Sequence, residues 1–166
     1  MLAQNFLTAE ELQLRPCEYE ALIKVLGILE RGEITFVPNV IGKVRREHIQ
    51  VGESNPSARN FVFNMAVWHC HLPCGTVHCI GGLAEEIGGF HFSNYNLAGL
   101  DELFHPFNSF MRMTAFNSFV YDDNGERIDP PDWEALTVSQ AAMALRSYLN
   151  SGHPHWGEAV GLKEKR

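Results

Sequence analysis

The sequence has no long apolar run, little cysteine and no excess of basic charge. No stretch approaches the roughly 18–20 apolar residues with which a helix spans a bilayer. Residues 1–11 have neither a basic start nor a long apolar stretch, so we expect no secretory signal and no membrane partner. The 4 cysteines are too few for a disulfide scaffold, and we expect a cytoplasmic protein with reduced thiols.

Charge and composition narrow the class further. The chain has 13 basic and 20 acidic side chains, a formal net charge of −7, which argues against nucleic acid as a partner. Its 166 residues are 45% apolar and 20% charged, close to the averages of globular proteins. No internal repeat or linker divides the sequence, so we expect a single domain over residues 1–166.

The clearest local signal is an amphipathic helix over residues 17–31. Its apolar residues recur at the i, i+3, i+4, i+7 spacing of one helical face: Tyr19, Leu22, Ile23, Leu26 and Leu29. Pro16 suits the first helical position, and Gly32 suits the residue after the end.

Three further segments have a helical pattern. Residues 76–88 have one apolar face and end at two glycines; the face comprises Thr76, Cys79, Ile80, Leu83, Ala84 and Ile87. Residues 96–107 have an apolar stripe of Leu97, Leu100, Leu103 and Phe104. Thr137 and Gln140 form a capping-box pattern that opens a helix to about Asn150, with Gly152 after it.

The other segments indicate little regular structure. Residues 34–60 form a long irregular stretch, in which 34–37 is a candidate strand and 44–49 a candidate short helix. We expect the apolar residues 61–68 to enter the core as a short helix or strand, and residues 69–73 to form a turn.

Two signals near the end of the chain complete the fold prediction. Asn124-Gly125 indicates a β-hairpin over residues 118–128, and residues 160–166 are a frayed charged tail. We therefore expect a mainly α fold, a single compact helical domain of about four main helices, with room for one short β-hairpin.

The most unusual feature is a cluster of cysteine and histidine. Six of the chain's 12 such residues fall within residues 69–79, where an even distribution would place fewer than one. One interpretation is a zinc site formed by His71, Cys74 and His78, with a fourth ligand from His69, Cys70 or elsewhere. The spacing lacks the paired Cys-x2-Cys pattern of common zinc modules.

Three other interpretations of the cluster stay open. Cys74, placed just before the expected helix at 76–88, is a candidate nucleophile, since a helix N-terminus favours thiolate. A disulfide could join Cys74 to Cys79 or to Cys70. In the packing interpretation, Cys79 faces the core and His69 and His71 lie in an exposed turn.

At these residues the chain resembles an uncharacterised family of small bacterial and phage-associated proteins. Residues 63–68 match its Phe-Asn/Asp-Met-x-x-Trp segment, and residues 74–84 match its Cys-Gly-Thr-x-x-Cys-Ile/Leu-x-Gly-Trp-Ala motif. The resemblance covers residues 60–156 and implies a mainly helical fold but no activity. Leu83 replaces the motif's Trp, and His69, Cys70 and His71 lie outside the motif, which weakens the zinc interpretation.

Together these observations favour a non-enzymatic interaction or regulatory module with an unidentified protein or small-molecule partner. The alternatives are a Cys/His-dependent hydrolase or transferase that uses Cys74, and a module stabilised by Zn²⁺ bound within residues 69–79. The Phe- and Met-rich residues 104–119 are a candidate homodimer surface or apolar pocket. His153 and His155 are a weaker candidate for metal binding.

Overall fold

The computed structural model describes residues 5–36, 61–65, 69–72, 75–94, 97–105, 120–121, 127–128 and 135–161. At residues 61, 69–72, 75–77, 98, 120–121 and 127–128 only the backbone is described. The predicted helix at 44–49, most of the irregular stretch 34–60 and most of the Phe- and Met-rich stretch 104–119 lie outside these residues. The expected frayed tail is described only as far as residue 161.

The predicted first helix is confirmed as α1, Pro16–Glu30. One face is buried, as the apolar spacing predicts, and comprises Ala21, Leu22, Val25, Leu26 and Leu29. The chain leaves the helix through Gly32, whose φ of 65° lies in the left-handed region that only glycine adopts at little cost.

The predicted helices at 96–107 and 138–150 are confirmed as α4, Ala98–Phe104, and α6, Val138–Ser151. The Thr137 hydroxyl accepts a hydrogen bond from the Gln140 N–H at 3.2 Å, so the predicted capping box forms. Gly152 ends α6 with a φ of 78°. A short helix follows, α7, Trp156–Ala159, whose buried Trp156 indole N–H donates to the Glu102 carbonyl at 2.8 Å.

The helix predicted over 76–88 is wrong in its first turn. Residues Gly75–His78 form strand β4, and helix α3 spans only Ile80–Gly88, with Cys79 as its N-cap. The predicted turn at 69–73 is also wrong, because His69–Leu72 forms strand β3, paired antiparallel with β4. Backbone pairing with β2 and β3 outweighs the helical spacing of Thr76. Such pairing joins separate segments, so the local periodicity of the sequence does not reveal it.

These strands belong to a four-stranded sheet of order β1-β2-β4-β3. Strand β1, Thr35–Phe36, and strand β2, Phe61–Phe63, run parallel to β4, while β3 is antiparallel to it. The candidate strand at 34–37 is therefore confirmed at residues 35–36, and residues 61–63 are a strand. The predicted hairpin is confirmed by β5, Val120–Tyr121, and β6, Arg127–Ile128; its Asn124-Gly125 turn lies outside the described residues.

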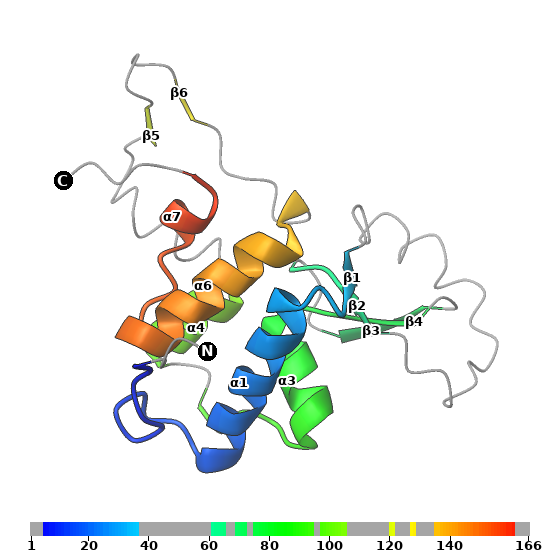
Figure 1. Ribbon diagram of the computed structural model, residues 1–166, viewed down its shortest axis with the longest axis vertical. Coiled ribbons are helices and arrows are strands. Elements are labelled where there is room, and N and C mark those ends of the chain that lie inside the picture. The colour runs from blue at the N-terminus through cyan, green and yellow to red at the C-terminus, as the bar shows by residue number, and fades with distance from the viewer. Residues whose placement is uncertain are drawn as a thin grey trace.

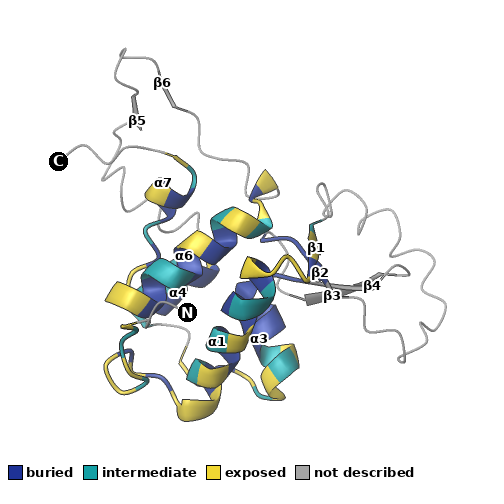
Figure 2. Cartoon of the chain, viewed as in Figure 1, coloured by how far each residue is buried: buried dark blue, intermediate teal, exposed yellow. Residues whose placement is uncertain are grey.

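The arrangement is mainly helical. Helix α1 packs against both α3 and α6, α4 packs against α6, and the sheet lies beside the C-terminal end of α1 (Figure 1). The faces that the helices turn toward one another are buried (Figure 2), and one apolar cluster joins residues of α1, α3, α4, α6, α7 and β2. Among the described residues, no helix is long and apolar enough to cross a membrane.

A buried carboxylate fixes the start of α1. Glu18, with only 3% of its side chain exposed, accepts hydrogen bonds from the Arg15 backbone N–H at 2.8 Å and the Arg15 Nε at 3.0 Å. The Ser93 backbone N–H, at 2.8 Å, and the Ser93 hydroxyl, at 3.1 Å, also donate to it. Glu18 therefore joins α1 to the segment that follows α3.

Burial alone would raise the pKa of Glu18, but the hydrogen bonds from Ser93 and Arg15 outweigh it and hold the pKa below its ordinary value of 4.5. The folded state therefore binds this proton more weakly than the unfolded state. The ionised Glu18 carboxylate therefore stabilises the folded protein above the pKa that Glu18 has in the unfolded state. This stabilisation is lost as the pH falls through the lower pKa of Glu18 in the folded state.

We expect Glu18→Gln to lower the free energy of unfolding by about 1–3 kcal/mol at pH 7, because donors matched to a carboxylate would meet an amide. The difference in the free energy of unfolding between the variant and the parent protein should shrink below about pH 4, because the Glu18 carboxylate of the parent itself becomes protonated. Urea unfolding at several pH values measures both effects. Glu33→Gln, in the exposed pair with Arg31, is the control and should change little. Equal losses in the two variants would contradict the assigned role.

Two helical glycines should respond to alanine in opposite directions. A Cβ at Gly99 in α4 would overlap the backbone carbonyl oxygen of Gly152, which cannot move without displacing the end of α6. A Cβ at Gly27 in α1 would meet only the far end of the exposed Arg31 side chain, at 2.8 Å. We expect Gly99→Ala to destabilise the protein by about 1–3 kcal/mol and Gly27→Ala to stabilise it by about 0.5–1 kcal/mol. Thermal unfolding of the two variants tests this, and stabilisation by Gly99→Ala would contradict the close approach of α4 to α6.

Candidate functional site

Strand pairing changes how the cysteine and histidine cluster is arranged. The register pairs His69 with His78, Cys70 with Val77, His71 with Thr76 and Leu72 with Gly75. Paired positions lie on the same face of an antiparallel ladder, and successive positions alternate between faces. Positions 69, 71, 76 and 78 therefore share one face, and positions 70 and 77 share the other.

His78 connects this face to the core of the protein. Strand β4 pairs with β3 along one edge and with β2 along the other. In the second pairing, Phe63 of β2 lies opposite His78. Both side chains are fully buried, and Phe63 belongs to the main apolar cluster. The His78 side chain is therefore turned toward the core at this point of β4.

The structure brings together only part of the predicted zinc set. Positions 71 and 78 are diagonal neighbours on one face of the β3–β4 ladder, whereas Cys74 lies outside the described residues. Among the side chains that the structure describes, no group of three or more His, Cys, Asp or Glu could hold a metal. The side chains of His69 and His71 are not among them, so the zinc hypothesis stays a prediction.

The structure contradicts the reason for expecting a reactive thiolate at Cys74, namely a helix that starts directly after it. Strand β4 lies between residue 74 and the start of α3 at Ile80, so Cys74 does not precede a helix N-terminus. That part of the nucleophile hypothesis is wrong. The role of Cys74 itself stays a prediction.

Cys79 occupies the helix start instead, and the expectation that it is a buried residue is confirmed. Its sulfur accepts a hydrogen bond from the Gly82 N–H at 3.5 Å. Burial raises the pKa of the Cys79 thiol from 9.0 to about 11, although backbone N–H groups of Gly82 and Gly81 act in the opposite direction. Cys79 keeps its thiol, so the Cys74–Cys79 disulfide is not formed in this structure. Near neutral pH it is a buried thiol, and a poor nucleophile.

The second candidate for metal binding contains two histidines that differ in exposure. His153 is exposed and its Nδ1 lies 3.7 Å from a Glu102 carboxylate oxygen, while His155 is half-buried at the start of α7. The ring centres of His153 and His155 are 6.2 Å apart. Nothing in the described residues completes a metal site around them.

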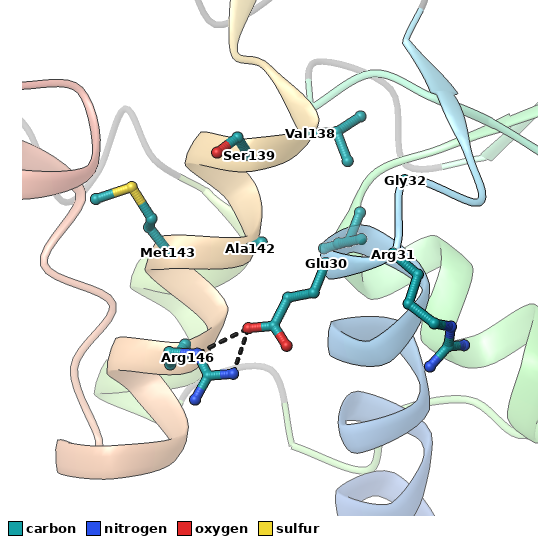
Figure 3. Close-up of a pocket in the computed structure, with 9 residues that line it drawn as sticks. Glu30, Arg31, Gly32, Val138, Ser139, Ala142, Met143 and Arg146 are labelled. Atoms are coloured by element: carbon teal, nitrogen blue, oxygen red, sulfur yellow. Dashed lines mark hydrogen bonds and ion pairs between the residues drawn. The ribbon is translucent and has the colours of Figure 1, made fainter. Parts of the chain in front are cut away.

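A groove of about 510 Å³ lies between the C-terminal end of α1 and the first turns of α6 (Figure 3). Leu29 lines it on the α1 side, and Val138, Ala142 and Met143 line it on the α6 side. Met143 is 52% exposed and is the large apolar side chain that the described residues leave in solvent. The groove therefore combines an apolar lining with an exposed apolar edge.

Charged groups on the groove's edge are already paired. The Arg146 guanidinium donates to the Glu30 carboxylate, with its Nε at 2.7 Å from Oε1, and joins α6 to α1 across one end of the groove (Figure 3). The same guanidinium lies 5.7 Å from the centre of the Phe6 ring, within cation–π range. Arg31, which also lines the groove, pairs with Glu33 at 2.6 Å. The charges of the rim are therefore largely compensated.

Sequence reasoning missed this groove. Its walls come from helices more than a hundred residues apart in the sequence, so no local pattern describes it. One signal was present, because Met143 is apolar but lies outside the inward stripe of its helix, beside the buried Ala142. An apolar residue off the buried stripe indicates a surface patch, although a single such residue is common.

Comparisons with known proteins found no matching family model, no matching curated protein and no matching solved structure.

The two described cysteines should differ strongly in reactivity. Cys17 is exposed at the start of α1, whereas Cys79, the N-cap of α3, is buried and only 2% exposed. We expect an alkylating reagent to modify Cys17 rapidly in the native protein and Cys79 only after unfolding in denaturant, as peptide mass mapping would show. Equal rates at Cys17 and Cys79 in the native state would contradict the burial of Cys79.

Proposed function

We propose that this protein is a non-enzymatic interaction module that binds a protein partner in the groove between α1 and α6. The supporting observation is the groove itself, about 510 Å³ with an apolar lining and the exposed Met143 at its edge. Its volume lies within the range of about 300–1,000 Å³ that is typical of binding pockets. We expect the partner to be cytoplasmic, as the composition suggests for this protein.

The shape and charge of the groove favour one kind of partner. Two packed helices form its walls, and such grooves accept an amphipathic helix that inserts apolar anchors. Glu30 and Arg146 are paired with each other, as are Arg31 and Glu33, so the rim offers few uncompensated charges to an incoming chain. Burial of apolar surface would then drive binding, and salt would change the affinity little.

The alternatives have less support from the described residues. Cys74, the candidate nucleophile, and residues 106–119, most of the candidate homodimer surface, both lie outside them. The acidic net charge of −7 favours neither nucleic acid nor an anionic membrane surface as the partner. The interaction module therefore remains the first hypothesis.

A photo-crosslinking amino acid at position 143 tests this proposal in the full-length chain. We expect irradiation in an extract of the source cells to give one discrete adduct, largely unchanged between low and high salt. The matched control places the same amino acid at Glu86, which is exposed on α3 and does not line the groove, so no such adduct should form there. A second substitution, Ala142→Glu, puts a charge in the apolar lining and should abolish the adduct.

The outcomes are distinct. An adduct that forms equally at positions 143 and 86, or that survives Ala142→Glu, would contradict binding in the groove. An adduct with the mass of two chains would identify the partner as a second copy of this protein. Circular dichroism checks that each variant keeps its helix content. This control matters most for Ala142→Glu, because Ala142 lines the groove but is only 6% exposed.

A further inference from the structure

The β3–β4 hairpin places three histidines at adjacent positions on one face of the sheet. His69 is directly opposite His78, and His71 is two residues along β3 on the same face. Directly opposed residues of antiparallel strands have Cβ atoms about 4.5–5.5 Å apart, and diagonal neighbours about 7–8 Å apart. Positions 69, 71 and 78 therefore form a compact triangle of histidines.

A triangle of this size suits a transition metal. Neutral imidazole nitrogens bind Zn²⁺ at about 2.0–2.1 Å, and three histidines with one open position are a known ligand set for this ion. Imidazole also suits Cu²⁺ and Ni²⁺, whereas Ca²⁺ and Mg²⁺ prefer oxygen ligands. The residue types at these positions therefore select one class of ion.

The backbone around His78 is held on both sides. Strand β4 pairs with β2 and β3, and the His78 carbonyl accepts a hydrogen bond from the Asn64 N–H at 3.0 Å. His69 and His71 lie on β3, the last strand in the order of this sheet. A site of these three residues would thus combine one position on an inner strand with two positions on the last strand of the sheet.

We propose that the face of the β3–β4 hairpin on which positions 69, 71 and 78 lie together is a binding site for one divalent transition-metal ion, with Zn²⁺ as the first candidate. This set differs from the one that spacing alone predicts, since His69 takes the place of Cys74. The reason is the register, because His69 and His78 are opposed across two strands rather than placed on a turn and a helix. The site is independent of the α1–α6 groove, and its failure would leave the proposed function untouched.

Titration of the full-length protein, without a histidine tag, with Co²⁺ tests the site, because the spectrum of this ion distinguishes its ligands. We expect one Co²⁺ per chain with no near-ultraviolet cobalt–thiolate band, and displacement by Zn²⁺. His69→Ala and His71→Ala should each weaken binding by at least about tenfold, since loss of even an outer-shell partner costs about 10–100-fold. Cys74→Ser should leave affinity and spectrum unchanged. His91→Ala, which removes an imidazole that is 91% exposed, is the control for incidental surface binding.

The alternative results each overturn the proposal. A thiolate band that Cys74→Ser abolishes would restore the set of His71, Cys74 and His78. Binding that neither His69→Ala nor His71→Ala weakens, or that His91→Ala weakens as much, would place the ion elsewhere. Absence of stoichiometric binding would exclude the site. The variants at 69 and 71 avoid the fully buried His78, whose replacement could unfold the protein.

Discussion

Burial of the apolar face of α1 organises the described structure. This face packs against α3 on one side and α6 on the other, so that Leu22, Val25 and Leu26 lie in the interior. Each such side chain contributes about 1.5–3 kcal/mol when fully buried. Both candidate sites depend on this packing. The C-terminal end of α1 forms one wall of the groove, and α3, which continues from β4, is held against α1 partly by the bonds of Glu18 to Ser93.

The helices could be predicted from the sequence because their signals are local. Thr137 and Gln140 form the capping box that the pattern indicates, and Gly32 and Gly152 end their helices with positive φ. The apolar spacing identified the buried face of α1 correctly. Each of these signals lies within one or two turns of the element that it predicts, so neighbouring residues contain enough information to locate the helix.

The sheet could not be predicted in the same way, because its pairings join distant residues. Strand β4 is specified by partners at 61–63 and 69–72, and no window around Thr76 contains them all. Thr76 lies about one helical turn before the first residues of α3, so it fits the helical spacing by chance. The predicted helix therefore began too early and included residues that form strand β4. The consequence for the candidate site is large, since the register, rather than helical geometry, decides which histidines are neighbours. The groove was missed for a related reason, because its walls are brought together only in the folded chain.

The contact between Gly99 and Gly152 has an evolutionary consequence. Gly152 is constrained by its φ of 78°, and Gly99 by the carbonyl oxygen of Gly152 against which α4 packs. A relative with a larger residue at position 99 would have to move the end of α6, and with it α7, whose Trp156 is bonded to α4 through Glu102. Each position therefore has its own reason to remain glycine: position 152 because of its backbone conformation, and position 99 because a backbone carbonyl lies against it. A relative that keeps both glycines could retain the close packing of α4 against the end of α6, whereas one that loses Gly99 could not do so without a shift of the backbone.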